Sequence, residues 1–160
     1  MADVTAIDLN VKRPLGGVPF GNLTTLRYEI AVAAGVFTAS DKATAVAIND
    51  VILAGVIPEG FILVDAAITS DGVILGATNA DIDVGFEYID GADVTALPEG
   101  VDVIFNGLNA DAAIYVTTKT AYTPKQIAFT KDAYLSVKVL TAAFSGTGTL
   151  KINLIGICDQ

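Results

Sequence analysis

The sequence predicts an all-β protein, an antiparallel β-sandwich of eight to nine strands of the jelly-roll type with an extended N-terminal arm. Apolar and polar residues alternate with a period of two over most of the chain from residue 24 onward, as half-buried strands do. Clusters of Gly, Asp and Asn separate these stretches at short intervals, and such clusters form turns. No stretch longer than about ten residues keeps a helical period, so an α/β fold is not expected.

Nine stretches are enriched in the β-branched and aromatic residues that suit a pleated, half-buried surface. They are residues 24–34, 45–56, 61–69, 81–89, 101–106, 112–118, 125–130, 132–141 and 148–157. The loops expected between them include residues 69–72, 89–93, 106–112 and 145–148. This strand number favours a jelly roll over an immunoglobulin-type sandwich, whose Cys…Trp…Cys core is impossible with no Trp and one Cys.

The 160 residues fit one domain, which we place at residues 24–160, after an arm of residues 1–23. The arm contains two Pro, three Gly and the adjacent bases Lys12 and Arg13. It is too rich in Val, Ile, Leu and Phe for a free linker. We therefore expect it to become ordered on its own sandwich or on a neighbour, with a frayed terminus as the alternative.

Hydrophobic residues make up 52% of the chain, and this excess predicts a well-filled core with apolar surface left for subunit contacts. The longest apolar runs, residues 30–37 and 51–57, are far shorter than the ~20 residues of a membrane helix. The N-terminus has no apolar run typical of a signal peptide. The single cysteine, Cys158, excludes an internal disulfide and fits a reducing cytoplasm. We expect no membrane partner.

Charge is distributed unevenly along the chain. Residues 1–42 carry four acids and four bases, residues 43–118 carry twelve acids and no base, and residues 119–160 carry two acids and five bases. Neutralising nucleic-acid phosphates needs a basic stripe, so a chain with a net charge of −9 is not expected to bind nucleic acid. A protein partner is the better expectation.

The absence of His removes the commonest general base and transition-metal ligand, which excludes Ser-His-Asp and Cys-His catalysis. The carboxylates crowded into residues 81–102 are the remaining candidates: Asp81, Asp83, Glu87, Asp90, Asp93, Glu99 and Asp102. Alternation places the first three on the polar face of one strand. We interpret that face as solvated. A bound cation and carboxylate catalysis remain as alternatives, although no calcium-loop motif is present. We expect no cofactor, no metal site and no catalytic residue.

Three segments resemble the jelly-roll decoration (cement) proteins of tailed-bacteriophage heads. They are "VIPEGFILVDAAITSDG" (56–72), "ATNADIDVGFEYIDG" (77–91) and "AYLSVKVLTAAFSGTGTLKINLIGI" (133–157). The resemblance covers roughly residues 50–157 and lies in strand order and turn placement. It implies a homotrimer on the outer capsid surface, assembled in the bacterial cytoplasm, which braces the major capsid protein. The family supplies no catalytic residues.

On this interpretation the arm reaches onto the shell, and its capsid contacts are Lys12, Arg13, Pro14 and Phe20. The acid-only middle of the chain would face solvent, and the neutral and basic ends would face the capsid. The alternative is a head-fibre or tail-associated jelly-roll module for attachment or glycan binding. Such a module needs exposed aromatics, whereas Tyr88, Tyr115, Tyr122 and Tyr134 fall in or beside strands, where we expect them to pack. A carboxylate hydrolase and a self-assembling shell or tube subunit are further alternatives.

Overall fold

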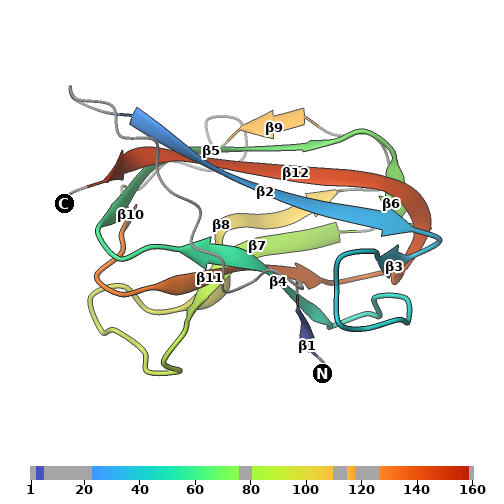
Figure 1. The fold of residues 1–160 in the computed structure, drawn as a ribbon, viewed down its shortest axis with the longest axis horizontal. Coiled ribbons are helices and arrows are strands. Elements are labelled where there is room, and N and C mark those ends of the chain that lie inside the picture. Colours follow the sequence, from blue (N-terminus) through green and yellow to red (C-terminus); the bar gives the residue numbers. More distant parts are fainter. Residues whose placement is uncertain (1–2, 6–22, 76–80, 110–114, 118–126, 159–160) are drawn as a thin grey trace.

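The chain forms two β-sheets packed face to face (Figure 1). The structure, a computed structural model, describes residues 3–5, 23–75, 81–109, 115–117 and 127–158. These residues contain no helix, and therefore none that is long and apolar enough to cross a bilayer. The predicted all-β antiparallel sandwich is confirmed. Its finer assignment to the jelly-roll type stays a prediction.

The first sheet has five strands in the order β1-β4-β11-β7-β8. Their bounds are β1 Asp3–Thr5, β4 Val51–Ile57, β7 Asp81–Tyr88, β8 Gly100–Asn109 and β11 Ala133–Val139. All neighbouring pairs are antiparallel except β1 with β4, which is parallel. The sheet therefore has β8 at one edge and β1 at the other.

The second sheet has seven strands, five of them in the order β10-β5-β12-β2-β3. Their bounds are β2 Leu23–Ala33, β3 Val36–Phe37, β5 Phe61–Ser70, β10 Ile127–Ala128 and β12 Phe144–Cys158. The short strands β6 (Val73–Leu75) and β9 (Tyr115–Thr117) pair with β12 and β5, respectively. Strand β12 forms the centre of the sheet, because it pairs with β2 on one side and with β5 on the other.

Alternating apolar side chains from both sheets fill the space between the layers. In β2, for example, Leu26, Tyr28, Ile30 and Val32 are buried, and the residues between them are exposed or half-buried. The ring of Tyr28 needs a glycine opposite it, since a Cβ at Gly55 of β4 would lie 2.8 Å from that ring. The Tyr28 hydroxyl donates a hydrogen bond to the Val56 carbonyl at 2.8 Å, so its polar end is satisfied.

Phe129, which follows β10, links the two sheets at one end of the sandwich. Its ring centroid lies 4.9 Å from that of Phe86 in β7, at an edge-on angle of 75°, and 6.5 Å from that of Phe61 in β5. Its backbone N–H donates to the Phe61 carbonyl at 2.9 Å, and its carbonyl accepts from the N–H of Gly60 at 2.8 Å. The residue is therefore fixed by both its main chain and its side chain.

Each of the nine predicted strands corresponds to a strand of the structure, but several boundaries were wrong. Residues 45–50, predicted to start a strand, lie outside the strands and turn at residues 48–49, where Asn49 has a φ of 66°. The buried Asp50 carboxylate holds this turn by accepting hydrogen bonds from the Ala47 N–H at 3.0 Å and from Lys42 Nζ at 2.6 Å. Local side-chain hydrogen bonds of this kind compete with strand pairing.

Two predicted loops are also strands. Residues 145–148 belong to β12, and residues 106–109 belong to β8. Gly146 lets β12 approach β6 closely and does not form the predicted turn, because a Cβ there would lie 1.8 Å from the Val73 carbonyl oxygen. The short strands β1, β3 and β6 were not predicted. Within the predicted arm, β1 pairs with β4, and the boundary between arm and sandwich stays a prediction.

We predict that Phe129→Ala lowers the free energy of unfolding by about 3–5 kcal/mol, the usual cost of removing a buried Phe side chain. The control is Tyr115→Ala, since Tyr115 is 76% exposed and its truncation should change stability by less than about 0.5 kcal/mol. Chemical denaturation of the two variants and the parent measures both effects. Equal stabilities for Phe129→Ala and the parent would contradict the role assigned to Phe129.

Candidate functional site

The acidic strand β7 does not present the solvated face that its alternation predicted. Ile82, Val84, Phe86 and Tyr88 are buried in the core as expected, but Asp83 is only 8% exposed. Its carboxylate accepts a hydrogen bond from the backbone N–H of Gly107 in β8 at 2.7 Å. The register of the neighbouring strands places Val51, Leu53 and Ser136 on the same side as Asp83, and all three are buried. The prediction was wrong because a period of two shows which residues share a side of the sheet, but not what covers that side.

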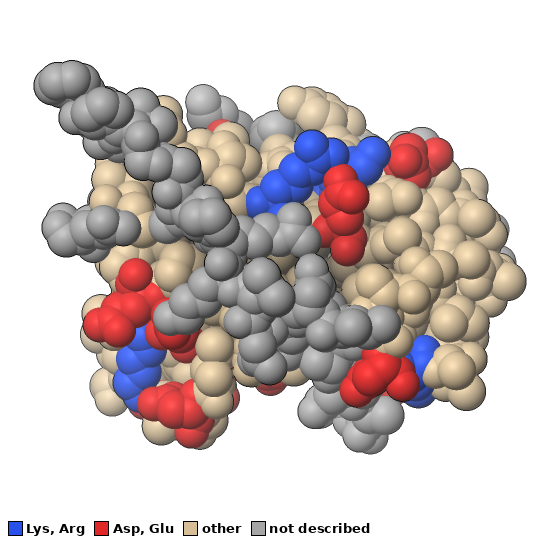
Figure 2. Space-filling model, in the orientation of Figure 1, with Lys and Arg blue, Asp and Glu red and all other residues tan. Residues whose placement is uncertain are grey.

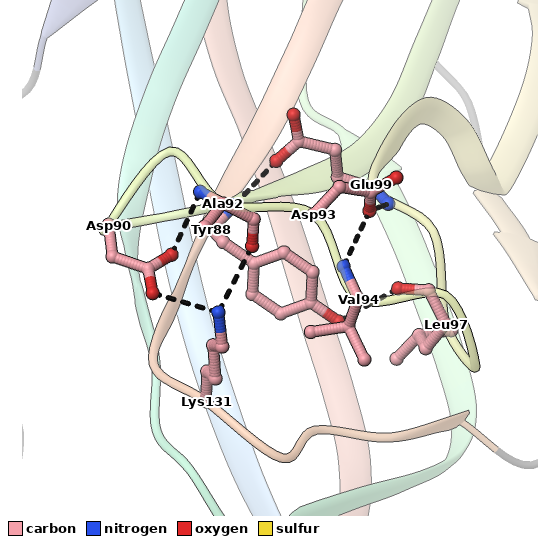
Figure 3. Close-up of polar contacts among 8 residues, drawn as sticks. All are labelled: Tyr88, Asp90, Ala92, Asp93, Val94, Leu97, Glu99 and Lys131. Carbon is pink, nitrogen blue, oxygen red and sulfur yellow. Dashed lines mark hydrogen bonds and ion pairs between the residues drawn. The ribbon is translucent and has the colours of Figure 1, made fainter.

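The loop that follows β7, residues 89–99, is built around the buried ring of Tyr88 (Figure 3). The Tyr88 hydroxyl donates to the Leu97 carbonyl at 2.9 Å, and the Tyr88 N–H donates to Glu99 Oε2 at 3.0 Å. Lys131 Nζ lies 5.6 Å from the ring centroid, within the range of a cation–π contact. Figure 3 shows the tyrosine ring with loop residues on several sides of it.

The carboxylates of this loop accept hydrogen bonds from its own backbone and from one lysine. Asp93 Oδ1 accepts from the N–H groups of Val94 and Glu99, both at 2.8 Å. Asp90 accepts from Lys131 Nζ at 2.8 Å, and Lys131 also donates to the Ala92 carbonyl at 3.1 Å. These carboxylates therefore position the loop.

The electrostatics of the loop agree with this role. Burial, and then the negative charges of Asp93, Glu99 and Asp90, raise the pKa of the Tyr88 phenol above its ordinary value, so it stays a neutral donor. The hydrogen bond from Lys131, and then that from the Ala92 N–H, lower the pKa of Asp90. Among the described residues, no group of three or more Asp, Glu, Cys or His side chains is arranged to hold a metal ion.

A groove of about 670 Å³ opens beside this loop. One wall is formed by loop residues 94 and 96–99 and by residues of β8, and the other by β5, β10 and Thr130. Its apolar lining includes Leu63, Val64, Leu97, Val103, Ile104 and Ile127. Its ionisable lining consists of Asp65, Glu99 and Asp102, with no Lys or Arg among the described lining residues. We call this feature the groove.

An apolar row continues from the groove across the outer face of the second sheet. Leu23, Ile157, Ile62 and Ala128 are direct register partners across β2, β12, β5 and β10. Leu23 is 62% exposed and Ile157 is 37% exposed. Ala128 lines the groove as well, so it joins the two features. We call these four residues the apolar row.

The sequence did not reveal the groove or the apolar row, because each combines short segments from distant parts of the chain. The residues singled out as capsid contacts, Lys12, Arg13, Pro14 and Phe20, lie outside the described residues. Cys158 is half-buried at the end of β12. Tyr88 packs as expected, whereas the exposed Tyr115 does not, since its strand β9 pairs only along the edge of β5 among the described strands.

Basic side chains near the chain ends pair with acids of the middle, so the charge blocks of the sequence are not separate faces of the molecule. Lys131 pairs with Asp90, Lys151 with Asp71 and Lys42 with Asp50, at 2.8, 3.3 and 2.6 Å, and Arg27 pairs with Glu29 at 2.7 Å. Figure 2 shows blue and red side chains in contact at several places on one face. Four of the five described bases are therefore in ion pairs within the chain.

The chain has the same fold as chains of two phage capsids. One belongs to the capsid of Ralstonia phage GP4, with 19% identity, a TM-score of 0.66 and coverage of 99% of each chain. The other belongs to the capsid asymmetric unit of cyanophage Pam1, with 16% identity, a TM-score of 0.56 and coverage of 94% of this chain and 95% of that one. No family model and no curated protein sequence matches this chain.

We predict that replacing Asp90 with Asn makes stability less sensitive to acid. The pKa of Asp90 is lower than its ordinary value of 3.8, so the stability that its charge adds is present above that value. It is lost as the pH falls through the lowered pKa of the folded state. The unfolding midpoint of the parent should therefore fall more steeply below about pH 4 than that of Asp90→Asn.

Both partners of the Asp90–Lys131 pair are exposed enough to be screened, so the difference should be small and should shrink further in 1 M salt. Thermal melts between pH 2 and 7 at two salt concentrations measure it. Parallel curves for the parent and the variant at low salt would show that the ion pair adds no pH-dependent stability.

Proposed function

We propose that this protein is a non-enzymatic structural component of a phage virion, which decorates and stabilises the outer surface of the head by binding the major capsid protein. The observation that carries the proposal is the structural similarity to chains of two phage capsids over nearly the full length of every chain compared. A shared fold does not by itself fix a function. The proposal therefore also depends on how the polar groups of this chain are used.

The chemistry of the chain supports a non-enzymatic role. It contains no His, and four of the seven carboxylates crowded into residues 81–102 hold the local structure of the chain. Asp83, Asp93 and Glu99 accept backbone hydrogen bonds, and Asp90 pairs with a lysine. Acids satisfied in this way fix the positions of strands and loops. A protein that braces its neighbours needs this stiffness.

The finer features of the proposal follow the family resemblance. The protein would act as a homotrimer on the shell, after assembly in the bacterial cytoplasm, and its N-terminal arm would contact the major capsid protein through Lys12, Arg13, Pro14 and Phe20. The arm is suited to such a contact by its composition, because it combines apolar side chains with two adjacent bases. The sandwich to which the arm is joined is held together by the long pairing of β12 with β2 and β5 and by the pairing of β4 with β11.

One residue favours the second candidate function, a head-fibre or tail-associated module that binds glycans. Tyr115 is 76% exposed, and exposed aromatic rings are typical contacts for sugars. A glycan array separates the two functions. Specific binding that Tyr115→Ala abolishes would favour the module, and no binding would favour decoration.

The proposed function is tested by adding the purified protein to heads of its own phage that were produced without it. We expect saturable binding to the outer surface, and we expect heads carrying the protein to release DNA at a higher temperature than bare heads. Sedimentation and a DNA-release assay measure the two effects. Heads that neither bind the protein nor gain heat resistance would overturn the proposal.

The role of the arm is tested with the double variant Lys12→Glu and Arg13→Glu. We expect the reversal of two charges to weaken binding to heads on the order of tenfold and to reduce its salt dependence, because charged contacts steer and orient association. A control with the same change in charge is the double variant Arg27→Glu and Lys151→Glu, two bases of the described sandwich. Equal occupancy of the double variant and the parent would remove the arm from the interface.

A further inference from the structure

We propose that the groove and the apolar row together form a docking site for a segment of the shell protein that is apolar and carries Lys or Arg. The inference rests on the proposed function, since it names the surface by which the sandwich itself is seated on the head. It adds a second contact, independent of the N-terminal arm.

The groove determines the chemistry of its partner. Its walls are apolar, and a groove of about 670 Å³ can accept several side chains of a protein segment. Asp65, Glu99 and Asp102 are its ionisable lining residues. Glu99 and Asp102 accept hydrogen bonds from a backbone N–H and an amide, respectively, and neither bond neutralises the charge. An incoming segment with Lys or Arg beside apolar residues complements this lining.

The apolar row extends the site onto the outer face of the second sheet. Leu23, Ile157, Ile62 and Ala128 carry no charge and lie side by side on adjacent strands. The adjacent row of register partners, Thr25, Ile155 and Asp65, brings one acid of the groove beside the apolar row, and farther along the same face lie the charged Arg27, Glu29 and Lys151. The apolar row is therefore an uncharged end of this face, bordered by an acid of the groove. Leu23 also directly follows the predicted arm, so the apolar row is continuous in sequence with the other proposed shell contact.

A second copy of this chain fits the site less well than the shell protein does. Four of the five described bases are already paired with acids of their own chain, so the described surface of another copy has little positive charge to offer. The apolar row spans four strands, about 14 Å at the usual strand spacing. A row one side chain wide is small beside the roughly 800 Å² per partner of a stable interface. A subunit held by further contacts on a shell can use such a site, because linked contacts reinforce one another.

Two variants test the site, each with a matched control. Asp102→Lys reverses a charge of the groove, and Glu29→Lys makes the same kind of change at an exposed residue away from it. Leu23→Ser removes an exposed apolar side chain of the apolar row, and Val73→Ser does so at the 48% exposed Val73 of β6. All four positions are on the surface, so the melting temperatures should stay close to that of the parent.

Binding of each variant to heads lacking the protein is measured by sedimentation, and the mass of each free protein by light scattering. We expect Asp102→Lys and Leu23→Ser to lower affinity on the order of tenfold, and the controls to bind like the parent. If Asp102→Lys and Leu23→Ser bind like their controls, while the parent binds, the docking site is overturned and the proposed function is left intact. A parent that fails to bind would overturn both. If the mass of the free protein changes for Asp102→Lys and Leu23→Ser but not for their controls, the site binds a second copy, and the inference is also overturned.

Discussion

The contact between the two sheets at Phe129 is the interaction on which the end of the molecule with the groove depends. Its ring meets Phe86 of one sheet and Phe61 of the other, and its backbone bonds to Gly60 and Phe61. The residues next to Phe129 in the sequence form part of the groove and hold the loop beside it. Ala128 and Thr130 line the groove, and Lys131 holds the loop of residues 89–99. A buried aromatic contact therefore fixes the geometry of an exposed surface.

Charge in this protein is used mainly to hold local structure. Asp50 fixes the turn before β4, Asp93 fixes the loop after β7, and Asp71 accepts a hydrogen bond from the Thr149 N–H at 2.6 Å. That backbone bond, with help from Lys151, lowers the pKa of Asp71. Because backbone donors and paired lysines satisfy these acids, a chain of net charge −9 can close its turns tightly. On the further inference, the groove acids Asp65, Glu99 and Asp102 also carry the charge that the shell protein meets.

The sequence was sufficient for the architecture, because alternation reports directly on which side chains face the core. The buried residues of β2 follow that pattern, whereas in β7 Asp83 and Gly85 are buried together with the core-facing residues. Alternation did not predict the role of a Gly or an Asp whose contact partner lies far away in the sequence. Gly146 permits the approach of Val73. The buried Asp83 accepts a hydrogen bond from the Gly107 N–H. Neither partner can be identified from local spacing. The groove could not be predicted for the same reason, since its walls come from segments around residues 64, 100 and 128.

The same fold occurs in chains of two phage capsids, and on the proposed function the end with the groove and the apolar row faces the shell. Electron cryomicroscopy of the phage head tests this most directly. The account predicts density for the sandwich on the outer surface, with the groove and Leu23 turned towards the major capsid protein. Density that places this chain inside the shell, or with that end turned to solvent and another face seated, would contradict it.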